Sequence, residues 1–545
     1  MLEGLMQRTP LMIADLLRHA NVAHGDRDIV SRLVDEPIWR YNYAGLNVRA
    51  SQAARVLARL GVTAGDRVSS LAWNTHRHLE LFYAVPGTAA ILHTVNPRFS
   101  DDQIIYTVNH AGSRILFFDR SFLSLVERLR PRLKAVEHFV LLAREPVDGV
   151  ECYEDLIGVE EPTFNWPVFD ENAAAMLCYT SGTTGDPKGV LYSHRSTVLH
   201  ALILSLAGSL NVSVFDVVMP CVPMYHAAAW GLPFIAAING CKLVLPCERM
   251  DGASLQELIQ DEGVTFSGGV PTVWGMYLDH LERTGQGCGA LRRVMIGGSA
   301  VPGGMDETFK SRYGVEVRQV WGMTEMNPLG VVSTPTPKIS AAGEDAMREF
   351  LRTRQGRMLF GVELRIVGDD GAELPRDGVA AGALQARGPW TIRRYYRGDR
   401  DVVDKESWFD TGDIATLDEA GFMRITDRAK DVIKSGGEWI SSIDLENIAA
   451  AYPGVKVAAA VGVHHPHWQE RPILVVEAHD GAEITEDGVL GHLRTRITRW
   501  WMPDKIIFAR VPLTATGKID KKVLRTRYAK VLADLADHEH APPPA

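Results

Sequence analysis

The chain has 545 residues, of which 67 are acidic and 58 are basic, so its net charge is −9 with histidine neutral. Hydrophobic residues make up 46% and charged residues 23%, which excludes a disordered chain and is typical of a globular protein. This length predicts about two to four domains or subdomains, and the net acidity argues against nucleic acid as the main partner.

The six cysteines occur singly, with no CxxC pair, at positions 152, 178, 221, 241, 247 and 288. They predict reduced thiols in a cytoplasmic protein rather than a disulfide framework or a zinc ribbon. The first twenty residues carry an acid at Glu3 and polar residues at Gln7 and Arg8, which is unlike a signal peptide. We expect an amphipathic surface helix there, and no integral membrane segment, because no apolar run reaches ~18 residues.

Helices and strands alternate along the first part of the chain. Helical spacing of apolar residues covers 44–60 and ends at Gly61. A short buried strand is predicted at 68–71, a helix at about 79–90, a strand at 113–119 and a helix at 122–129. The alternation resumes from 173 to about 320, and it predicts a mostly parallel sheet covered by helices.

The pattern changes after residue 360. Strands are predicted at 363–367, 382–387 and 421–425, with a surface hairpin over the Gly- and Asp-rich stretch 369–383. From about 430, strands at 455–463, 473–478 and 506–508 and helices at 489–500 and 521–535 predict a small α+β domain of roughly 110 residues. The expected fold class is α/β: a large N-terminal body of βα-layered subdomains with a β-rich subdomain (1–429), then a C-terminal domain (430–545).

The most informative segment is Thr-Ser-Gly-Thr-Thr-Gly-Asp-Pro-Lys-Gly at 180–189, between two β-like runs. Its small and hydroxylated residues can surround an anion with backbone N–H groups and hydroxyls, and the lysine adds a positive charge. The anion-binding residues expected here are Thr180, Ser181, Gly182, Thr183, Thr184 and Lys188. A Walker loop is excluded, because Pro187 precedes the lysine and Gly189 follows it. A plain polar turn is the alternative.

This segment resembles the phosphate-binding loop of the adenylate-forming superfamily, which includes acyl-CoA synthetases, peptide-synthetase adenylation domains and beetle luciferases. Four further segments follow in that family's order, so the resemblance covers nearly the whole chain. It implies an ATP-dependent ligase that joins a small-molecule carboxylic acid to coenzyme A through an acyl-adenylate, with Mg²⁺ as the metal. It also implies a mobile C-terminal domain and a homodimer.

The resemblance assigns roles to residues in the second and third segments, at 296–302 and 319–325. Trp321 would stack on adenine, where the family more usually has tyrosine. Thr324 would bind the α-phosphate, and Glu325 would hold Mg²⁺. The other residues implied at the nucleotide are Gly298, Ser299, Ala300 and Gly322, and Gly297 would border the acyl pocket.

The last two segments, at 408–439 and 513–520, complete the implied site. Asp413 would bind both ribose hydroxyls with support from Arg428, Lys430 would be the hinge of the C-terminal domain, and Lys518 would be the catalytic lysine. Rotation about the hinge would then bring the other face of that domain to the site for transfer to CoA. The residues implied at the pantetheine entrance are Lys434, Ser435, Gly436, Gly437 and Trp439.

The acyl side is assigned to His226, also expected among the catalytic residues, and Trp230. A helix over this stretch would place both side chains on one face; a core tryptophan beside a buried histidine is the alternative. The segments at 229–233 and 500–504 resemble the bacterial medium-chain fatty acyl-CoA synthetases, a branch that includes ligases for 3-(methylthio)propionate. We therefore expect a short- or medium-chain fatty acid, with 3-(methylthio)propionate or an aryl-alkanoate as alternatives.

Three other readings remain open. An enzyme that loads a carrier protein would share the same motifs, but the region 222–227 has no acid to bind the amino group of an amino-acid substrate. A luciferase-like oxygenase also shares them. A non-catalytic nucleotide-binding protein would be expected to have lost Lys518, Glu325 or the loop, and all are present.

Overall fold

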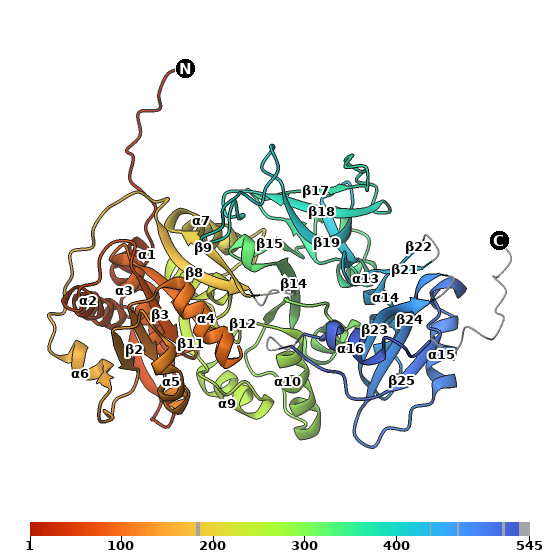
Figure 1. The fold of residues 1–545 in the computed structure, drawn as a ribbon, viewed down its shortest axis with the longest axis horizontal. Coiled ribbons are helices and arrows are strands. Elements are labelled where there is room, and N and C mark those ends of the chain that lie inside the picture. The colour runs from red at the N-terminus through yellow and green to blue at the C-terminus, as the bar shows by residue number, and fades with distance from the viewer. Residues whose placement is uncertain (181–185, 436–437, 466–467, 515–517, 533–545) are drawn as a thin grey trace.

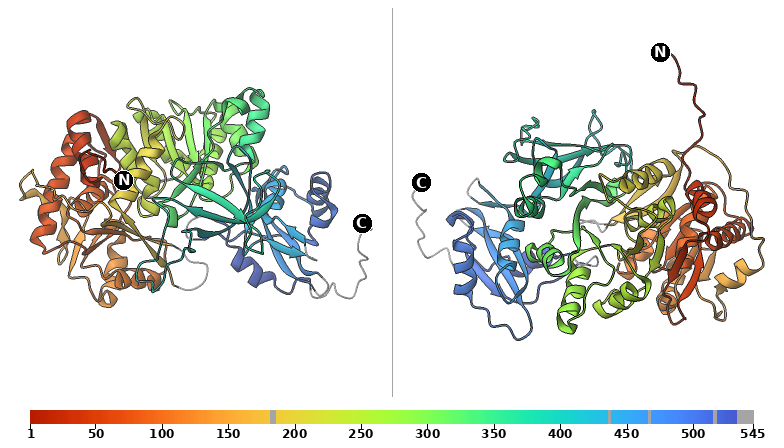
Figure 2. Two further views of the ribbon diagram at one scale, coloured as in Figure 1. Left: turned by 90° about the horizontal axis from the view of Figure 1, so that it is seen from above. Right: turned by 180° about the vertical axis from the view of Figure 1, so that it is seen from behind.

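The computed structural model describes residues 1–180, 186–435, 438–465, 468–514 and 518–532. A large body contains two sheets, and a smaller domain follows it at the C-terminal end of the chain (Figures 1 and 2). The predicted α/β class, with a β-rich part before a small α+β domain, is confirmed.

The first sheet of the body is parallel except at one edge. Its described strands, in spatial order, are β7 (Glu151–Cys152), β6 (His138–Leu141), β5 (Ile115–Phe118), β3 (Arg67–Leu71), β4 (Ile91–Thr94), β8 (Ala174–Thr180) and β9 (Lys188–Ser193). Only the β8–β9 pair among them is antiparallel. Ile115 and Leu116 face opposite cores, because successive side chains of a strand alternate in direction.

The second sheet has a parallel half and an antiparallel half. Its described strands run β2 (Trp39–Asn42), β1 (Asp28–Ser31), β11 (Lys242–Leu245), β10 (Val217–Pro220), β12 (Phe266–Gly269), β13 (Arg293–Ile296), β14 (Glu316–Gly322), β15 (Leu329–Val332), β16 (Gly356–Met358), β20 (Phe422–Arg428), β19 (Phe409–Leu417), β18 (Ala381–Arg387) and β17 (Glu363–Val367). The strands from β1 to β14 pair in parallel, whereas β2 and the strands beyond β14 pair antiparallel. The predicted hairpin over 369–383 is the β17–β18 connection.

Helices fill the space between the two sheets and cover their outer faces. The central core takes residues from both sheets and from α1 (Ile13–His24), α2 (Tyr43–Arg59), α3 (His76–Gly87), α7 (His194–Ser205) and α8 (Leu232–Asn239). The outer face of the second sheet is covered by α9 (Gly252–Glu262) and α10 (Pro271–Thr284), and that of the first by α4 (Asp101–Ala111) and α5 (Leu123–Leu129). The shorter helices of the body are α6 (Tyr153–Gly158), α11 (Gly303–Glu307), α12 (Pro337–Ser340) and α13 (Glu344–Arg352).

The C-terminal domain is built on a separate mixed sheet with apolar residues on both faces. Its described strands are β22 (Glu438–Ile440), β21 (Ile433–Ser435), β24 (Gln469–Ala478), β23 (Val455–His465) and β25 (Lys505–Phe508). α14 (Ser442–Ala450) and α15 (Glu486–Arg494) pack on one face, and α16 (Lys521–Tyr528) packs on the other. This domain therefore has its own core, as the change of pattern near residue 430 predicts.

Three expectations about helices were wrong in extent. The helix expected at 521–535 ends at Tyr528. α1 begins only at Ile13, and the preceding residues are extended and mostly exposed, since Pro10 disfavours the helical conformation of the residue before it. The helix expected at 489–500 ends at Arg494, where the Thr495 hydroxyl donates to the His492 carbonyl. Within the described residues, no helix combines the length and the apolar character needed to cross a membrane. All six cysteines are buried.

Candidate active site

The strands that flank the predicted phosphate-binding loop form as expected. β8 ends at Thr180 and β9 begins at Lys188, and these two residues are directly paired across the antiparallel ladder. The loop therefore leaves and re-enters the sheet at one point. Of the residues predicted to bind the anion, Ser181, Gly182, Thr183 and Thr184 lie outside the described residues.

Lys188 and Glu325 both contact the side chain of Tyr395. The Lys188 Nζ atom lies 4.9 Å from the centre of the Tyr395 ring, a distance at which a cation is attracted to the aromatic face. The Tyr395 hydroxyl donates a hydrogen bond of 2.8 Å to Glu325 Oε1. Two residues predicted from separate segments of the sequence are therefore linked through a third.

The segment that carries Thr324 and Glu325 is fixed through its backbone. Tyr192 of β9 donates its hydroxyl to the Thr324 carbonyl at 2.6 Å, and the Ile392 N–H donates to the Glu325 carbonyl at 2.7 Å. At the preceding Gly322 a Cβ atom would collide with the carbonyl oxygen of Pro328, so only glycine fits. Thr324 and Glu325 thus present their side chains from a rigid connection between β14 and β15.

The predicted ribose anchor, Asp413, is buried at the junction of three elements. Its Oδ1 atom lies 2.6 Å from the Arg428 Nε atom, and the two residues are cross-strand partners on β19 and β20. Its Oδ2 atom accepts a hydrogen bond of 2.9 Å from the indole N–H of Trp321. Burial raises the pKa of Asp413, against the opposing influence of Arg428 and Trp321. The departure from tyrosine at position 321 therefore supplies a donor to this carboxylate.

Oδ1 of Asp413 is close to the Arg428 cation, yet it accepts no hydrogen bond of good geometry from any described residue. A buried oxygen of this kind costs free energy unless a ligand supplies the missing donor. A ribose hydroxyl is such a donor. Trp321 occupies one lone pair of Oδ2 and leaves the other, so the prediction that Asp413 binds both ribose hydroxyls stays a prediction.

The connection after β13 borders the same region. Gly297 packs its backbone against Val320, where a Cβ would come within 2.5 Å of the valine side chain. Gly298 has a φ of +85°, which favours glycine, and a Cβ there would lie 3.6 Å from the Trp230 indole. Ser299 and Ala300, by contrast, are exposed. The acyl-side residue Trp230 therefore lies against the predicted adenine-side segment.

The right-handed helix considered for the stretch that carries His226 and Trp230 does not form. Ala227, Ala228, Ala229 and Trp230 all have positive φ values, between 39° and 54°, and make a left-handed turn that leads into α8. Each such residue costs free energy outside glycine, so the turn persists only because its four side chains are buried. The four-residue spacing of a right-handed helix therefore does not place His226 and Trp230 on one face.

Lys518 reaches this region from the C-terminal domain. The charges of Asp413, Glu325, Arg428 and Lys430 all act on its ammonium, and that ammonium in turn acts on His226. Burial, then the neighbouring Arg428, lowers the pKa of Lys518 to about 8. The lysine predicted to be catalytic is thus brought to the predicted ribose and metal residues.

His226 is neutral near pH 7. Burial, and then the positive charge of Lys518, lowers its pKa to about 4. This side chain can donate or accept one hydrogen bond at each ring nitrogen, but it does not act as a cation at the α-phosphate. Any catalytic contribution is therefore that of an uncharged imidazole.

Lys430 lies in a tight turn between β20 and β21. The N–H groups of Asp431 and Val432 both donate to the Arg428 carbonyl at 2.8 Å, which closes the turn around it. Burial lowers the pKa of Lys430. A turn between the body and the small domain is the place expected for a hinge.

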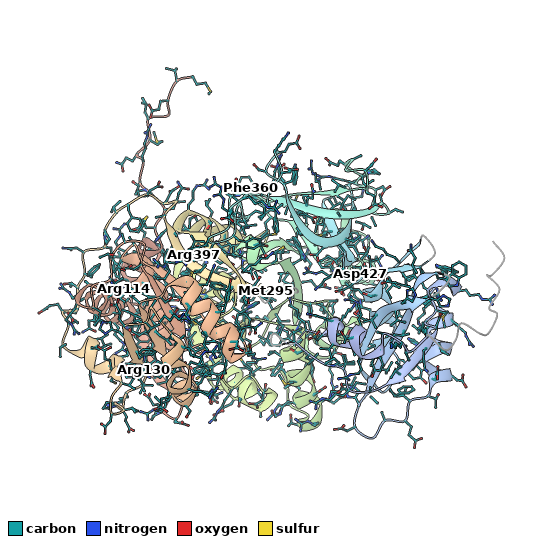
Figure 3. All side chains as sticks on the ribbon, in the orientation of Figure 1. Arg114, Arg130, Met295, Phe360, Arg397 and Asp427 are labelled. Atoms are coloured by element: carbon teal, nitrogen blue, oxygen red, sulfur yellow. The ribbon has the colours of Figure 1, made fainter. Side chains whose placement is uncertain are left out.

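The junction between the body and the C-terminal domain also holds a polar contact beside that turn. Asp427 of β20, labelled in Figure 3, accepts hydrogen bonds from the Ser442 backbone N–H at 2.6 Å and from its hydroxyl at 2.9 Å. Lys521 of α16 donates to the same Ser442 hydroxyl at 2.6 Å. These contacts hold α14 and α16 against β20 in the described orientation.

The residues predicted to border the CoA entrance lie on β21 and β22. The Ser435 side chain is fully buried, and its hydroxyl accepts from Arg471 at 3.2 Å, so it faces the interior of the small domain. Lys434 is exposed, and its backbone N–H donates to Glu470. Gly436 and Gly437 lie outside the described residues, as does the side chain of Trp439.

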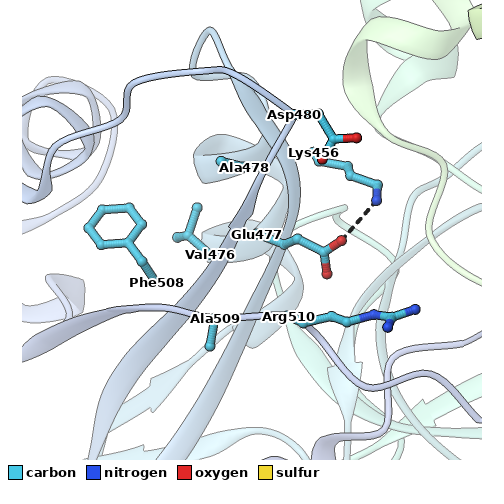
Figure 4. Close-up of a pocket in the computed structure, with 8 residues that line it drawn as sticks. All are labelled: Lys456, Val476, Glu477, Ala478, Asp480, Phe508, Ala509 and Arg510. Atoms are coloured by element: carbon cyan, nitrogen blue, oxygen red, sulfur yellow. Dashed lines mark hydrogen bonds and ion pairs between the residues drawn. The ribbon is translucent and has the colours of Figure 1, made fainter.

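A separate hollow lies on the C-terminal domain, beside the paired strands β23, β24 and β25 (Figure 4). Lys456 and Glu477 form an ion pair of 2.9 Å at its edge. Its lining includes neither Lys518 nor any residue predicted at the nucleotide, so it is distinct from the candidate active site.

Tyr192 and Tyr395 are the described site residues that sequence reasoning missed. Both act through contacts with residues more than 65 positions away in the chain. A tyrosine at the end of a strand or in a connection carries no local pattern that distinguishes it from a core residue. Only the folded structure shows that Tyr192 binds the Thr324 carbonyl and that Tyr395 binds the Glu325 carboxylate.

Comparison with known proteins identifies a family of AMP-binding enzymes. The AMP-binding enzyme model matches residues 17–396, and the AMP-binding enzyme C-terminal domain matches residues 444–518. The chain is 46% identical to a 3-methylmercaptopropionyl-CoA ligase of Ruegeria lacuscaerulensis, over 97% of this chain and 99% of the relative. It is 44% identical to a medium-chain-fatty-acid–CoA ligase of Ectopseudomonas oleovorans, over 97% and 98%. A solved anthranilate CoA ligase with anthranoyl-AMP has the same fold, with a TM-score of 0.86, 23% identity and coverage of 97% and 100%.

Proposed function

The chain belongs to the AMP-binding enzyme family, and we propose that this member ligates a short- or medium-chain carboxylic acid to coenzyme A. The reaction class is that of an ATP-dependent, AMP-forming acyl-CoA ligase. The observation that carries the proposal is that Lys518 of the C-terminal domain lies close enough to Asp413 and Glu325 of the body for their charges to act on it. One orientation of the chain thus brings a cation within reach of the two carboxylates proposed to bind ribose and the metal.

In the first half-reaction a carboxylate oxygen of the acid attacks the α-phosphorus of ATP. The new O–P bond forms as the bond to the β-phosphate oxygen breaks, and pyrophosphate leaves. Negative charge gathers around the α-phosphate, so fixed donors and cations lower the barrier. Lys518, the Thr324 hydroxyl and Lys188 would supply them, and the acid needs no base because it is already ionised at neutral pH.

Glu325 fits the role of a magnesium ligand. Its carboxylate is buried, its backbone is fixed, and one of its oxygens is oriented by Tyr395. Mg²⁺ prefers carboxylate and phosphate oxygens, and when bound it would neutralise charge on the phosphates. The side chain would hold this ion at the edge of the triphosphate.

In the second half-reaction the sulfur of CoA attacks the carbonyl carbon of the acyl-adenylate. The C–S bond forms and the thiol proton is released to solvent, while the C–O bond to AMP breaks and AMP leaves with the electron pair. Lys518 would obstruct the approach of the thiol in the described orientation. We therefore infer that the C-terminal domain (430–545) rotates about Lys430 and brings β21 and β22 towards the body, with Lys434 and Trp439 near the pantetheine.

The acyl group would lie beside Trp230. The indole packs against Gly298, so it limits the depth available on the side of the adenine segment. This supports a shorter acid, and the relatives named for 3-methylmercaptopropionate and medium-chain fatty acids agree with that range. An aryl-alkanoate of similar length is the second candidate.

The deciding experiment is a panel of acids from C2 to C16, with 3-(methylthio)propionate and aryl-alkanoates, assayed for CoA-dependent release of AMP. Highest kcat/KM for C3–C10 or methylthio acids is expected, because Trp230 shortens the pocket. A maximum at C14–C16 would contradict the proposed substrate range. Release of AMP with a carrier protein but not with CoA would contradict the ligase reaction itself.

A homodimer in the cytoplasm is also proposed. Light scattering of the purified protein would give a mass of twice 60.1 kDa for the dimer. A mass of one chain at working concentration would contradict this expectation.

A further inference from the structure

We propose that Tyr395 is a positioning residue that keeps Lys188 and Glu325 apart and oriented, so that both charges remain available to the triphosphate and its metal. The inference rests on the proposed ATP-dependent function. It starts from one side chain that contacts both residues, with its ring towards the lysine and its hydroxyl towards the glutamate.

Lys188 needs such a support because of its position. It is the first residue of β9, its side chain is exposed, and a lysine side chain has many rotamers. The face of Tyr395 attracts the ammonium at 4.9 Å and limits the directions in which it points. The cation is thereby held next to the loop that begins at Thr180.

Glu325 receives a different contact from the same residue. The Tyr395 hydroxyl donates to Oε1 at 2.8 Å, which fixes the plane of the carboxylate and leaves its other oxygen for a ligand. The ring and the hydroxyl of one tyrosine therefore engage both charged residues.

The two opposite charges do not pair with each other. Among the described residues, Lys188 and Glu325 form no ion pair within 4.0 Å, although both contact Tyr395. If Tyr395 did not engage both groups, a flexible ammonium and a buried carboxylate would attract each other strongly. Such a pair would neutralise the cation meant for phosphate and occupy the oxygen meant for the metal.

The neighbouring tyrosine provides a matched control. Tyr396 donates its hydroxyl to the Ala111 carbonyl at 3.2 Å and its ring packs near His110, so its hydroxyl and ring have other partners than those of Tyr395. Tyr396→Phe removes a hydroxyl of the same kind from the next residue. It should leave nucleotide binding unchanged.

Calorimetric titration of the full-length protein separates the two contacts, with ATP in MgCl₂, ATP in EDTA and AMP in EDTA as probes. Tyr395→Phe keeps the ring, so the dissociation constants of ATP and of AMP in EDTA should stay within twofold of the wild-type values. The gain in ATP affinity on adding magnesium should fall at least fivefold, because Glu325 is no longer oriented. Tyr395→Leu should also weaken ATP binding in EDTA at least fivefold, with AMP binding within twofold.

An unchanged magnesium-dependent gain in Tyr395→Phe would overturn the inference. Equal losses of AMP and ATP affinity in either variant would also overturn it, since they would indicate a merely structural role. A wild-type protein that binds ATP and forms acyl-CoA confirms the proposed function independently of these variants. A wild type that binds no ATP would refute the proposed function and this inference together.

Discussion

The indole N–H of Trp321 donates a hydrogen bond of 2.9 Å to Oδ2 of Asp413, which is 92 residues away in the chain. The aromatic face proposed for adenine is therefore tied directly to the carboxylate proposed for ribose. A tyrosine, the usual residue of the family at this position, would present its polar atom at the far end of the ring instead. The two residues proposed to recognise the nucleoside are thus coupled by a direct hydrogen bond.

Trp321→Phe should weaken ATP binding about 10-fold or more, because a hydrogen bond to a charged group contributes about 1.5–3 kcal/mol. The ring that stacks remains, so the loss reports the donor. The measurement is the KM for ATP, compared with 2′-deoxy-ATP and 3′-deoxy-ATP. Discrimination between ATP and both deoxy analogues should shrink, because Asp413 is less well oriented. Unchanged discrimination would argue against the coupling.

Lys518→Ala should reduce adenylation by at least 10³-fold, since it removes the cation nearest the developing charge. Pyrophosphate exchange measures this step. Transfer of a supplied acyl-adenylate to CoA should fall less than fivefold, because the lysine faces away in that orientation. Comparable losses in both assays would contradict the division of the reaction between two orientations.

The pH dependence of adenylation should follow Lys518. Its pKa is lowered to about 8, so the ammonium is present below that pH and is lost as the pH rises through it. The value of kcat/KM for ATP should therefore fall about tenfold per pH unit above pH 8, as it reports the free enzyme. Lys518→Arg, which stays charged, is the control, and its kcat/KM should not fall in this way above pH 8. A flat wild-type profile to pH 10 would contradict the assignment.

Lys430→Pro should impair thioester formation at least tenfold more than adenylation, because proline fixes φ at the proposed hinge and removes a backbone N–H. Lys430→Ala keeps the backbone free and serves as the control for loss of the side chain. The two half-reactions are measured separately, by pyrophosphate exchange and by CoA consumption from acyl-adenylate. If proline slowed both steps equally, the hinge would have to lie elsewhere.

Trp230→Gly should shift the preferred acid by two or more carbons towards longer chains. The substitution removes the indole beside Gly298, and glycine suits the φ of 53° found at this position. The acid panel described above measures the shift, and Trp230→Phe should change it less. A profile identical to that of the wild type would place the acyl chain away from this residue.

Much of the fold follows from periodicity. The alternation of helical and β-like stretches up to residue 320 predicted the parallel sheets, and β3, β5, β8 and β9 lie where the apolar runs occur. The shift near 430 predicted a separate domain core. Helices and strands of this kind can be predicted from neighbouring residues alone. The parallel strands are buried on both faces, so they appear in the sequence as continuous apolar runs.

Other features could not be predicted. The left-handed turn at 227–230 is made by three alanines and a tryptophan, which carry no glycine or asparagine signal, and only tertiary packing stabilises it. The link from Lys188 through Tyr395 to Glu325 joins three distant segments. The resemblance to a family indicated the two charged residues but not the tyrosine between them.

The six native cysteines are all buried, with thiols held among apolar neighbours or hydrogen-bonded within the fold. A cysteine introduced at an exposed position would consequently be the reactive one. Two such positions, one on the body and one on the C-terminal domain, could carry a pair of fluorescent dyes without first removing any native residue. Energy transfer between the dyes would then follow each turnover of a single molecule in real time.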